Sequence, residues 1–423
     1  MTKYITKRNG NKVEFDISKI ENAVFRAACD VSGTLGWTLT FCHEVAKDIA
    51  HDFEKAEYYH DGMTVEEIQD AVEELLMGDF PHVAKSYMIY RYEHQIARQK
   101  QLDEAIEEKL MAKKIDNQNA NVDEHSFGGR IGEASSIVMR NYALNHCMST
   151  MAKENHLNNE IYIHDLDHYA VGDHNCLSIP FDKLLREGFN TRQVDIRPAN
   201  SVNTAFQLVA VIFQLQSLQQ FGGVSATHLD WTMVPYVRKS FRKHFIDGLT
   251  YCEPDFSFNI KEYAEHIPVD AGIEGEEYKL QSNAYKYAMD MTEKEVYQAV
   301  EGMYHNLNSL QSRSGNQLPF TSVNYGTCTL PEGRMVIKAL LEVSIEGVGK
   351  LHKTSIFPCG IFQCMKGVNR KEGEPNYDLF RLALKSTAKR LYPNYVNVDW
   401  SNNAGYDVND PCTYTSTMGK RKL

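Results

Sequence analysis

The chain has 423 residues, of which 43% are hydrophobic, and its formal net charge is -11. This length favours two domains, and the acidic balance argues against a protein that binds nucleic acid through a basic face. No apolar run approaches the roughly 20 residues that cross a membrane, the opening MTKYITKRNG turns polar at once, and the nine scattered cysteines contain no Cys-x-x-Cys pair, so we expect a cytoplasmic protein with reduced thiols.

A β-hairpin followed by four helices is predicted for the N-terminal part. Tyr4-Ile5-Thr6 and Val13-Glu14-Phe15 flank an Asn-Gly turn, which is a strong hairpin signal. Thr64-Val65-Glu66-Glu67 is typical of a capping box that opens the third helix. The first helix should present Ile20, Val24 and Ala27 on one face, the second should cover residues 40–55, and the fourth should carry Ala84, Tyr87, Met88, Tyr90 and Arg91.

An exposed helix and a linker are predicted for residues 97–124, which are charged and then rich in asparagine. From residue 125 onward, helical stretches alternate with short strand candidates, and such alternation favours an α/β domain. Helices are expected over 131–153, 201–221, 228–248, 284–311, 334–347 and 376–391, and strands over 161–164, 176–180, 320–325, 355–363 and 395–399.

Two cations stand at the predicted hairpin turn. Lys7 and Arg8 precede Asn9 and Gly10, and the backbone N–H groups of such a turn, together with the two charges, suit a polyphosphate. Lys19, one helical turn into the next element, can join them. By itself this pattern also suits an ordinary solvated hairpin.

Thr64 adds a second anion-attracting feature, because the amino end of a helix favours negative charge. The residues that accompany it are Asp16, Ile68-Gln69-Asp70, Val72-Glu73, Ala84, Tyr87 and Tyr90-Arg91. Together with the hairpin they resemble an ATP-cone over residues 3–95. The resemblance implies an on/off switch that binds ATP or dATP, with Lys7, Arg8 and Lys19 at the phosphates and Thr64 lining the nucleotide.

A polar stretch, Ile161 to His168, is followed by His174-Asn175-Cys176. Its histidines and aspartates would suit a metal ion, but their spacing matches no standard pattern and such residues usually satisfy turns, so no metal ligands are assigned. Taken alone, Cys176 is equally well a buried structural thiol. Cys359 and Cys364 are interpreted as packing thiols.

The last stretch, residues 390–423, is rich in Tyr, Asn and Thr and is interrupted by Pro393, Gly405 and Pro411. That composition is typical of strands and loops that line a pocket. The stretch resembles the anaerobic (class III, glycyl-radical) ribonucleoside-triphosphate reductases, in which a Met-Gly-Cys step lies at the tip of a finger loop. Here Met418-Gly419 is followed by Lys420, so we expect an enzyme sequence that is cut off before the finger-loop cysteine.

The resemblance implies an α/β fold with three parts: an ATP-cone regulatory domain over 1–96, a linker over 97–124, and a partial catalytic domain over 125–423. The last part would be an incomplete ten-stranded α/β barrel of the reductase and glycyl-radical type. Members of the family carry Asn-Cys at the end of the first barrel strand. Asn175, Cys176 and Met418 are therefore carried over as catalytic-site residues, with Cys176 facing the ribose.

The implied activity is the anaerobic reduction of ribonucleoside triphosphates to deoxyribonucleoside triphosphates for DNA synthesis, controlled by ATP and dATP. A thiyl radical would abstract the 3′ hydrogen of the ribose, and Cys176 would supply a hydrogen from the opposite face. The family further implies a glycyl radical, a zinc site, a radical-SAM activating enzyme, formate or a thioredoxin-like reductant, and a homodimer; the radical segment and the zinc cysteines have no counterpart in this sequence.

Two alternatives to a complete enzyme stay open. The chain, inactive by itself, could be a truncated module that binds ATP or dATP without catalysis. Another glycyl-radical enzyme, such as a relative of formate lyase, agrees less well because those enzymes lack the ATP-cone.

Overall fold

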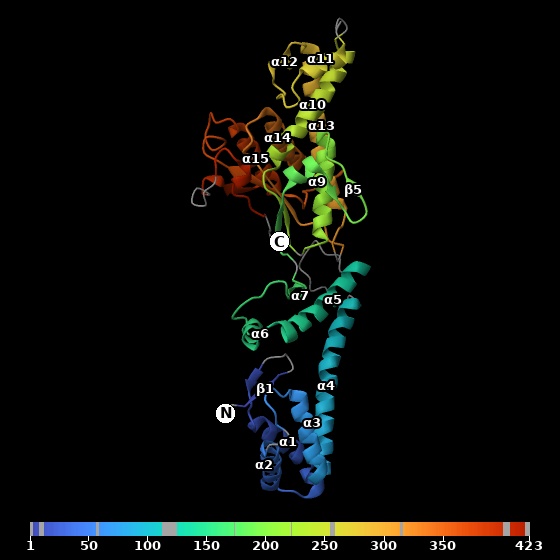
Figure 1. Cartoon of the computed structure of the whole chain (residues 1–423), viewed down its shortest axis with the longest axis vertical. Coiled ribbons are helices and arrows are strands. Elements are labelled where there is room, and N and C mark those ends of the chain that lie inside the picture. The colour runs from blue at the N-terminus through green and yellow to red at the C-terminus, as the bar shows by residue number, and fades with distance from the viewer. Residues whose placement is uncertain are drawn as a thin grey trace. The chain divides into compact units, whose positions relative to one another are not determined.

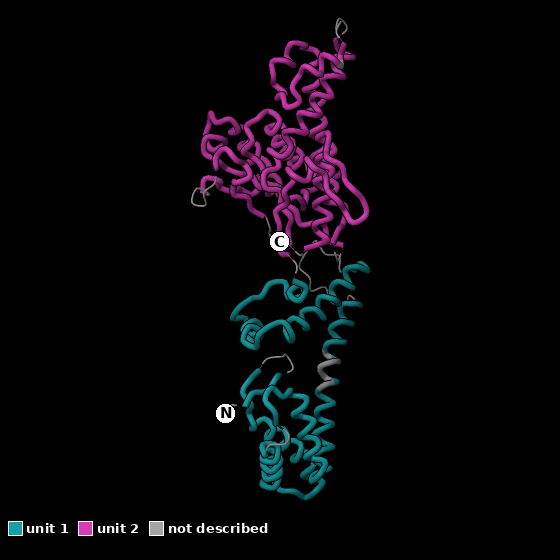
Figure 2. The backbone as a smooth tube through the Cα atoms, viewed as in Figure 1, with its two compact units in different colours: residues 1–116, 124–172 teal, residues 117–123, 173–423 magenta. Residues whose placement is uncertain are grey.

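The computed structural model describes residues 3–7, 12–55, 59–111, 125–172, 174–220, 222–253, 259–313, 316–400 and 407–418. The chain divides into two compact units, residues 1–116 with 124–172 (unit 1) and residues 117–123 with 173–423 (unit 2) (Figure 2). The predicted site residues Arg8, Asn9 and Gly10 lie outside the described residues, as do Gly419 and Lys420. Within the described part, none of the helices combines the length and the apolar character that a membrane crossing requires.

Unit 1 opens with the predicted hairpin, in which β1 (Tyr4–Thr6) pairs antiparallel with β2 (Lys12–Glu14). The hairpin is joined to the start of the third helix, because Thr6 forms a parallel bridge with Thr64 and its N–H donates to the carbonyl of Met63 at 2.8 Å. The residue after Thr6 is thereby brought close to the amino end of that helix.

Four helices complete the predicted N-terminal unit (Figure 1). They are α1 (Ser18–Leu35), α2 (Leu39–Glu54), α3 (Val65–Asp79) and α4 (Pro81–Leu110). The predicted apolar face of α1 is confirmed, since Ile20, Val24 and Ala27 are all buried. The predicted capping box is also confirmed: the Thr64 hydroxyl accepts the N–H of Glu67, and the Glu67 carboxylate accepts the N–H of Thr64 at 2.7 Å.

Helix α4 runs on past the predicted fourth helix and takes in the first part of the segment expected to be an exposed helix before a linker. Arg91 ties it to α3. The Arg91 guanidinium donates to the carboxylates of Glu66, Asp70 and Glu73 at 2.6 to 2.9 Å, and these acceptors lie on one face of α3.

Unit 1 also contains α5 (Phe127–Tyr142), a π-helical turn (Ala143–Cys147), α6 (Thr150–Leu157) and α7 (Leu166–Tyr169). The single helix predicted over 131–153 is therefore interrupted. The strand predicted over 161–164 is wrong. The N–H groups of Ile161 and Ile163 donate instead to Asn155 and His156 of α6, so these two donors do not take part in a sheet.

Unit 2 is built on five parallel strands in the order β3-β6-β7-β8-β9. They are β3 (Leu177–Ile179), β6 (Val224–Ala226), β7 (Thr321–Tyr325), β8 (Cys359–Cys364) and β9 (Asn394–Asn397). The predicted α/β class is confirmed. A small antiparallel pair, β4 (Phe189–Asn190) with β5 (Asp195–Ile196), was not predicted.

The strands of unit 2 are connected by helices. These are α8 (Phe181–Glu187), α9 (Val202–Ser217), α10 (Leu229–Tyr251), α11 (Ile260–His266), α12 (Glu276–Lys279), α13 (Ser282–Ser309), α14 (Pro331–Glu346) and α15 (Tyr377–Arg390), and a 3-10 turn (Pro411–Thr413) follows β9. The five long helices among them match the predicted helical stretches to within a few residues.

The main core lies between one face of the sheet and these helices. Val323, Tyr325 and Phe362 project from β7 and β8 into a cluster with apolar residues of α9, α10, α13, α14 and α15. Because side chains alternate along a strand, the residues between them must point to the opposite face. That opposite face carries the candidate site.

Candidate functional site on the polar face of the sheet

The face of the sheet that points away from the main core is lined by small polar side chains. Ser178, Ser225 and Ser322 occupy one register row across β3, β6 and β7, and paired residues point to the same face. Asn324 follows two residues further along β7, is fully buried, and donates to the hydroxyl of Ser225 at 3.1 Å. A parallel sheet ordinarily buries apolar residues on both faces, so this polar lining marks the face as special.

The terminal segment, which we define as residues 407–418, is hydrogen-bonded to this polar face. Asn324 accepts the N–H of Thr417 at 3.1 Å and donates to its carbonyl at 3.2 Å. Gln363 of β8 donates to the carbonyl of Thr415 at 3.1 Å. Two buried amide side chains thus bind the backbone of the segment much as a neighbouring strand would. Met418, a predicted site residue, is half-buried at its end.

Cys176 lies on the same face, immediately before β3. It stands two residues before Ser178 and so shares its side of the strand. The thiol is half-buried: its sulfur accepts the N–H of Gly223 at 3.4 Å and lies 3.5 Å from the side-chain oxygen of Asn175. Gly222 passes so close to the backbone of Asn175 that a Cβ there would have no room.

The described part of the terminal segment runs toward the strand that follows Cys176. Thr415 contacts Gln363 of β8, and Thr417 contacts Asn324 of β7, so the segment crosses from β8 to β7. Asn324 also lies nearer the amino ends of the strands than Gln363 does. Continuing across the sheet in this direction leads to β6 and β3. Cys176 and the described part of the terminal segment therefore lie on the same face of the sheet.

The carboxyl end of β7 is fixed by buried polar groups. Asp230 accepts the N–H groups of Gly326, Thr327 and Cys328 at 2.9 to 3.0 Å. Burial raises the pKa of the Asp230 carboxyl, while the hydrogen bonds from the N–H groups of Cys328 and Gly326 oppose that rise. Gly326 has a φ of 126°, a conformation that other residues rarely adopt. The turn after β7 is thus a rigid support for the polar face.

A second cluster lies at the carboxyl ends of β3 and β6. His228 Nε2 is 2.6 Å from a carboxylate oxygen of Asp182 and 3.7 Å from the sulfur of Cys412. Burial is the largest single influence here and by itself lowers the pKa of His228 and raises that of Asp182. The hydrogen bond between the two side chains and the charges around them together outweigh burial, so the pKa of His228 is raised and that of Asp182 is lowered. No motif in the sequence points to this cluster, because its members lie far apart along the chain.

The predicted nucleotide site of unit 1 is described only in part. Thr64 and Lys7 come together, because Lys7 directly follows the Thr6 that bridges to Thr64. Lys19 is exposed in the first turn of α1, where Asp16 is a close electrostatic neighbour. The Thr64 hydroxyl and its N–H are both engaged with Glu67, so the cap itself satisfies part of the helix end.

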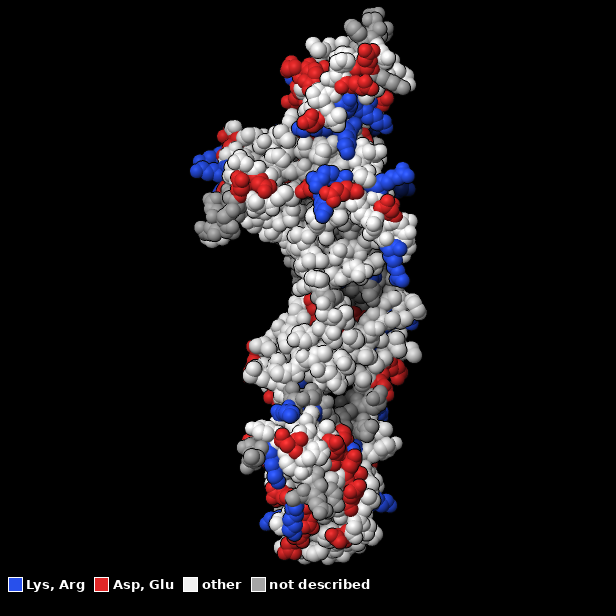
Figure 3. Space-filling model, in the orientation of Figure 1, with Lys and Arg blue, Asp and Glu red and all other residues white. Residues whose placement is uncertain are grey.

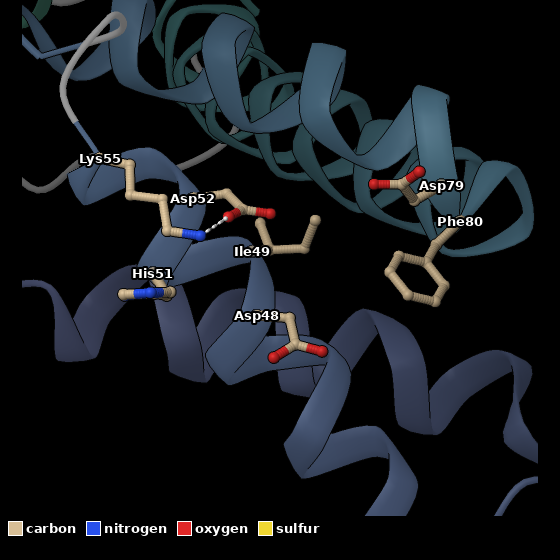
Figure 4. Close-up of a pocket in the computed structure, with 7 residues that line it drawn as sticks. All are labelled: Asp48, Ile49, His51, Asp52, Lys55, Asp79 and Phe80. Atoms are coloured by element: carbon tan, nitrogen blue, oxygen red, sulfur yellow. Dashed lines mark hydrogen bonds and ion pairs between the residues drawn. The ribbon is translucent and has the colours of Figure 1, made fainter.

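A surface pocket of about 320 Å³ in unit 1 is lined by acidic residues (Figure 4). Its lining consists of Asp48, Ile49, His51, Asp52, Lys55, Asp79 and Phe80. Lys55 is already paired with Asp52 at 3.1 Å. Three carboxylates against one paired lysine repel a polyphosphate, so the pocket does not suit a nucleotide. On the visible face of the same helices, acidic and basic side chains are interspersed (Figure 3).

Two protein-family models match this chain, one over its N-terminal part and one over most of the remainder. The family model for the ATP cone domain matches residues 3–96, and that for anaerobic ribonucleoside-triphosphate reductase matches residues 118–422. The second match begins inside the predicted linker, whereas the compact units group residues 124–172 with unit 1. The predicted boundaries between domains therefore stay a prediction.

Named relatives show the same affiliation. The chain is 30% identical to the anaerobic ribonucleoside-triphosphate reductase of Haemophilus influenzae over 402 residues, which cover 93% of this chain and 52% of the relative. It is also 30% identical to the Escherichia coli enzyme of that name, over 94% of this chain and 52% of the relative. The chain thus spans about half the length of these relatives.

A solved structure of the anaerobic ribonucleotide reductase from Thermotoga maritima, in complex with dATP and CTP, overlaps with a TM-score of 0.44 at 14% identity. The overlap covers 64% of this chain and 42% of that one. The affiliation rests on the family models, of which the second matches well over half of the residues. The chain belongs to the family of anaerobic ribonucleoside-triphosphate reductases and carries an N-terminal ATP cone.

Proposed function

We propose that this protein serves the anaerobic reduction of ribonucleoside triphosphates to deoxyribonucleoside triphosphates, under the control of ATP or dATP and in the cytoplasm. The observation that carries the proposal is the polar face of the sheet in unit 2. A half-buried thiol and a backbone segment ending in Met418 share that face, and its lining of hydroxyl and amide groups suits a ribose.

Cys176 is proposed as the group that supplies a hydrogen to the 2′ carbon of the ribose. Its sulfur has one backbone donor and the oxygen of Asn175 beside it, which together hold the thiol in place before β3. The burial of the thiol excludes part of the bulk water. The strength of the S–H bond of a thiol is close to that of a ribose C–H bond, so a hydrogen atom can pass between them. Asn175 is proposed as a positioning residue for the thiol.

The first hydrogen abstraction requires a second thiol, and this sequence has Lys420 where the family pattern has cysteine. An amine forms no comparable reversible radical, so we propose that the chain by itself does not complete the reaction. The family's glycyl radical, in general, supplies the oxidising equivalent for such a thiol. Among the described residues we assign none to that radical or to the family's zinc site. The activating enzyme, the reductant and a homodimer stay proposals.

Nucleotide binding by the cone is proposed at Lys7, Arg8, Asn9, Gly10, Lys19 and Thr64 (the nucleotide residues). Support comes from the bridge that brings the end of β1 to the start of α3. Calorimetry with ATP and with dATP tests it: each should release heat, and Arg8→Ala should weaken both affinities. The assignment would be refuted if neither nucleotide released heat, or if Arg8→Ala left both affinities unchanged.

A ribonucleotide binding test separates the enzyme from a module that only binds ATP or dATP. We expect CTP to bind the full chain, as measured by equilibrium dialysis, and we expect Arg8→Ala to leave this affinity unchanged. A loss of CTP binding in that variant would assign the nucleotide to the cone and favour the module. A turnover assay with a radical-SAM activating enzyme and formate should yield no deoxynucleotide from this chain alone.

A further inference from the structure

Three segments that are remote in sequence bring an oxygen, a nitrogen and a sulfur donor to one point of unit 2. Asp182 lies in the first turn of α8, His228 directly before α10, and Cys412 in the 3-10 turn of the terminal segment. One donor atom from each residue lies within 4.8 Å of the other two. This is the only such group of three among the residues that the structure describes.

We propose that Asp182, His228 and Cys412 form a binding site for one divalent cation of the zinc class (the edge site), which ties the terminal segment to the sheet. Carboxylate oxygen, imidazole nitrogen and thiolate sulfur are the three donor types that Zn²⁺ accepts, and three protein ligands leave a fourth position for water. The site is distinct from Cys176 and from the nucleotide residues, and it does not depend on the proposed reaction.

The surroundings of the histidine favour this role. His228 Nδ1 is 2.6 Å from the hydroxyl of Thr227, so a proton on Nδ1 has an acceptor and Nε2 can present its lone pair to an ion. The His228 side chain is about 10% exposed, which keeps the ring fixed in one orientation. Metal-ligating histidines are commonly oriented by a hydrogen bond of this kind from the other ring nitrogen.

The charges around the site also favour a cation. Asp182 contributes one carboxylate, and Asp410, two residues before Cys412, has its carboxylate turned to the N–H of Cys412 at 3.0 Å. Ion binding would displace the thiol proton of Cys412, and any second proton on His228, into solvent. The bound ion would then carry the charge that balances the thiolate and the carboxylate.

The present distances describe a hydrogen-bonded arrangement that is close to a coordination sphere. Ligand atoms around tetrahedral zinc lie about 3.3 to 3.6 Å from one another, given bond lengths of about 2.0 to 2.3 Å. The sulfur-to-nitrogen distance of 3.7 Å agrees with this, whereas the 2.6 Å between nitrogen and oxygen must widen. Rotation of the Asp182 side chain, which is 38% exposed, can provide that change.

A clamp at this position has a structural consequence. The terminal segment is held to the polar face by Asn324 and Gln363, and the edge site would add an attachment at Cys412, three residues before Thr415. An ion at the edge site would therefore limit how far the segment can shift along the face. Removal of the ion should loosen the segment without disrupting the main core.

Cobalt titration of the metal-stripped full chain tests the proposal, since Co²⁺ replaces Zn²⁺ and reports a thiolate ligand by a near-ultraviolet charge-transfer band. We expect the band to saturate at one equivalent, to disappear when Zn²⁺ is added, and to be absent in Cys412→Ser. The matched control is Cys147→Ser, which removes another exposed cysteine and should leave the band unchanged. A band that survives in Cys412→Ser, or no band in the unmodified chain, would overturn the site.

A second measurement needs no variant. Alkylation of each cysteine is followed by mass spectrometry with and without Zn²⁺. With Zn²⁺ at ten times its dissociation constant, only about one site in eleven is free, so Cys412 should react about tenfold more slowly while Cys147 keeps its rate. Equal slowing at both cysteines would identify adventitious surface binding and would refute a built site.

Discussion

Asn324 binds the backbone of Thr417 at both of its polar groups, accepting the N–H at 3.1 Å and donating to the carbonyl at 3.2 Å. The same amide nitrogen also donates to Ser225 and to the carbonyl of Ala226 within the sheet. A single fully buried side chain thus joins two strands to the terminal segment. Because an unsatisfied buried amide is costly, this junction has one strongly preferred geometry.

Asn324→Leu should therefore release the terminal segment. The substitution keeps the volume but removes the partner of the Thr417 backbone, and we expect a loss of about 1 to 3 kcal/mol in local stability. Hydrogen exchange of the amides in 413–418 would become faster. Asn308→Ala is a matched control, because Asn308 accepts the N–H of Ile356 in a different loop; it should leave exchange in 413–418 unchanged. Unchanged exchange in Asn324→Leu would contradict the role assigned to it.

The polar face of the sheet could be predicted in part from the alternation of residues along its strands. Within β7, Ser322 and Asn324 alternate with Val323 and Tyr325, so one polar and one apolar face can be derived from the sequence alone. The helices and the capping box at Thr64 were also predictable, since they depend on local patterns. The partners of Asn324 were not, because its contact to Thr417 joins residues 93 positions apart.

The failures of sequence reasoning have the same origin. The strand predicted over 161–164 consists of good strand formers, but its N–H groups found acceptors on α6, and no neighbouring strand lies beside it in the described part of unit 1. The edge site was missed because Asp182, His228 and Cys412 share no motif spacing. Contacts of this kind are decided by the order of the strands in the sheet.

Thr64→Ala separates a stabilising role from a nucleotide-binding role. Loss of the cap should cost about 0.5 to 2 kcal/mol in the stability of unit 1. Thr38→Ala is the matched control, because Thr38 caps α2 by accepting the N–H of Phe41 at 3.2 Å. Both variants should lower the melting temperature, but only Thr64→Ala should weaken ATP binding measured by calorimetry. Equal ATP affinities in the two variants would place the nucleotide elsewhere.

Gly222→Ala should displace Asn175 and with it Cys176. A Cβ at Gly222 would overlap the backbone of Asn175, and backbone cannot yield as a flexible side chain can. We expect a destabilisation of about 1 to 3 kcal/mol, measured by urea unfolding, together with faster alkylation of Cys176. Gly302→Ala is the control: Gly302 lies within α13 with open space around its Cα, so alanine should stabilise the chain by about 0.5 to 1 kcal/mol. Unaltered reactivity of Cys176 in Gly222→Ala would contradict the proposed link between Gly222 and the position of the thiol.

Glu295 should give unit 2 a pH dependence at mildly acid pH. His244 Nε2 lies 2.7 Å from its carboxylate, and this hydrogen bond lowers the pKa of Glu295. A carboxyl whose folded pKa lies below the unfolded value of about 4.3 stabilises the fold fully above that value, and the stabilisation is lost as the pH falls through the folded pKa.

The free energy of unfolding of Glu295→Gln should therefore lie about 1.5 to 3 kcal/mol below that of the unmodified chain at about pH 6, and the gap should narrow below about pH 4. Glu301→Gln is the control, since it alters an exposed carboxylate 3.9 Å from His305. Its free energy of unfolding, measured by urea titration, should differ from that of the unmodified chain by an amount that does not change with pH. A constant gap for Glu295→Gln across this range would mean that its carboxylate contributes through packing instead of charge.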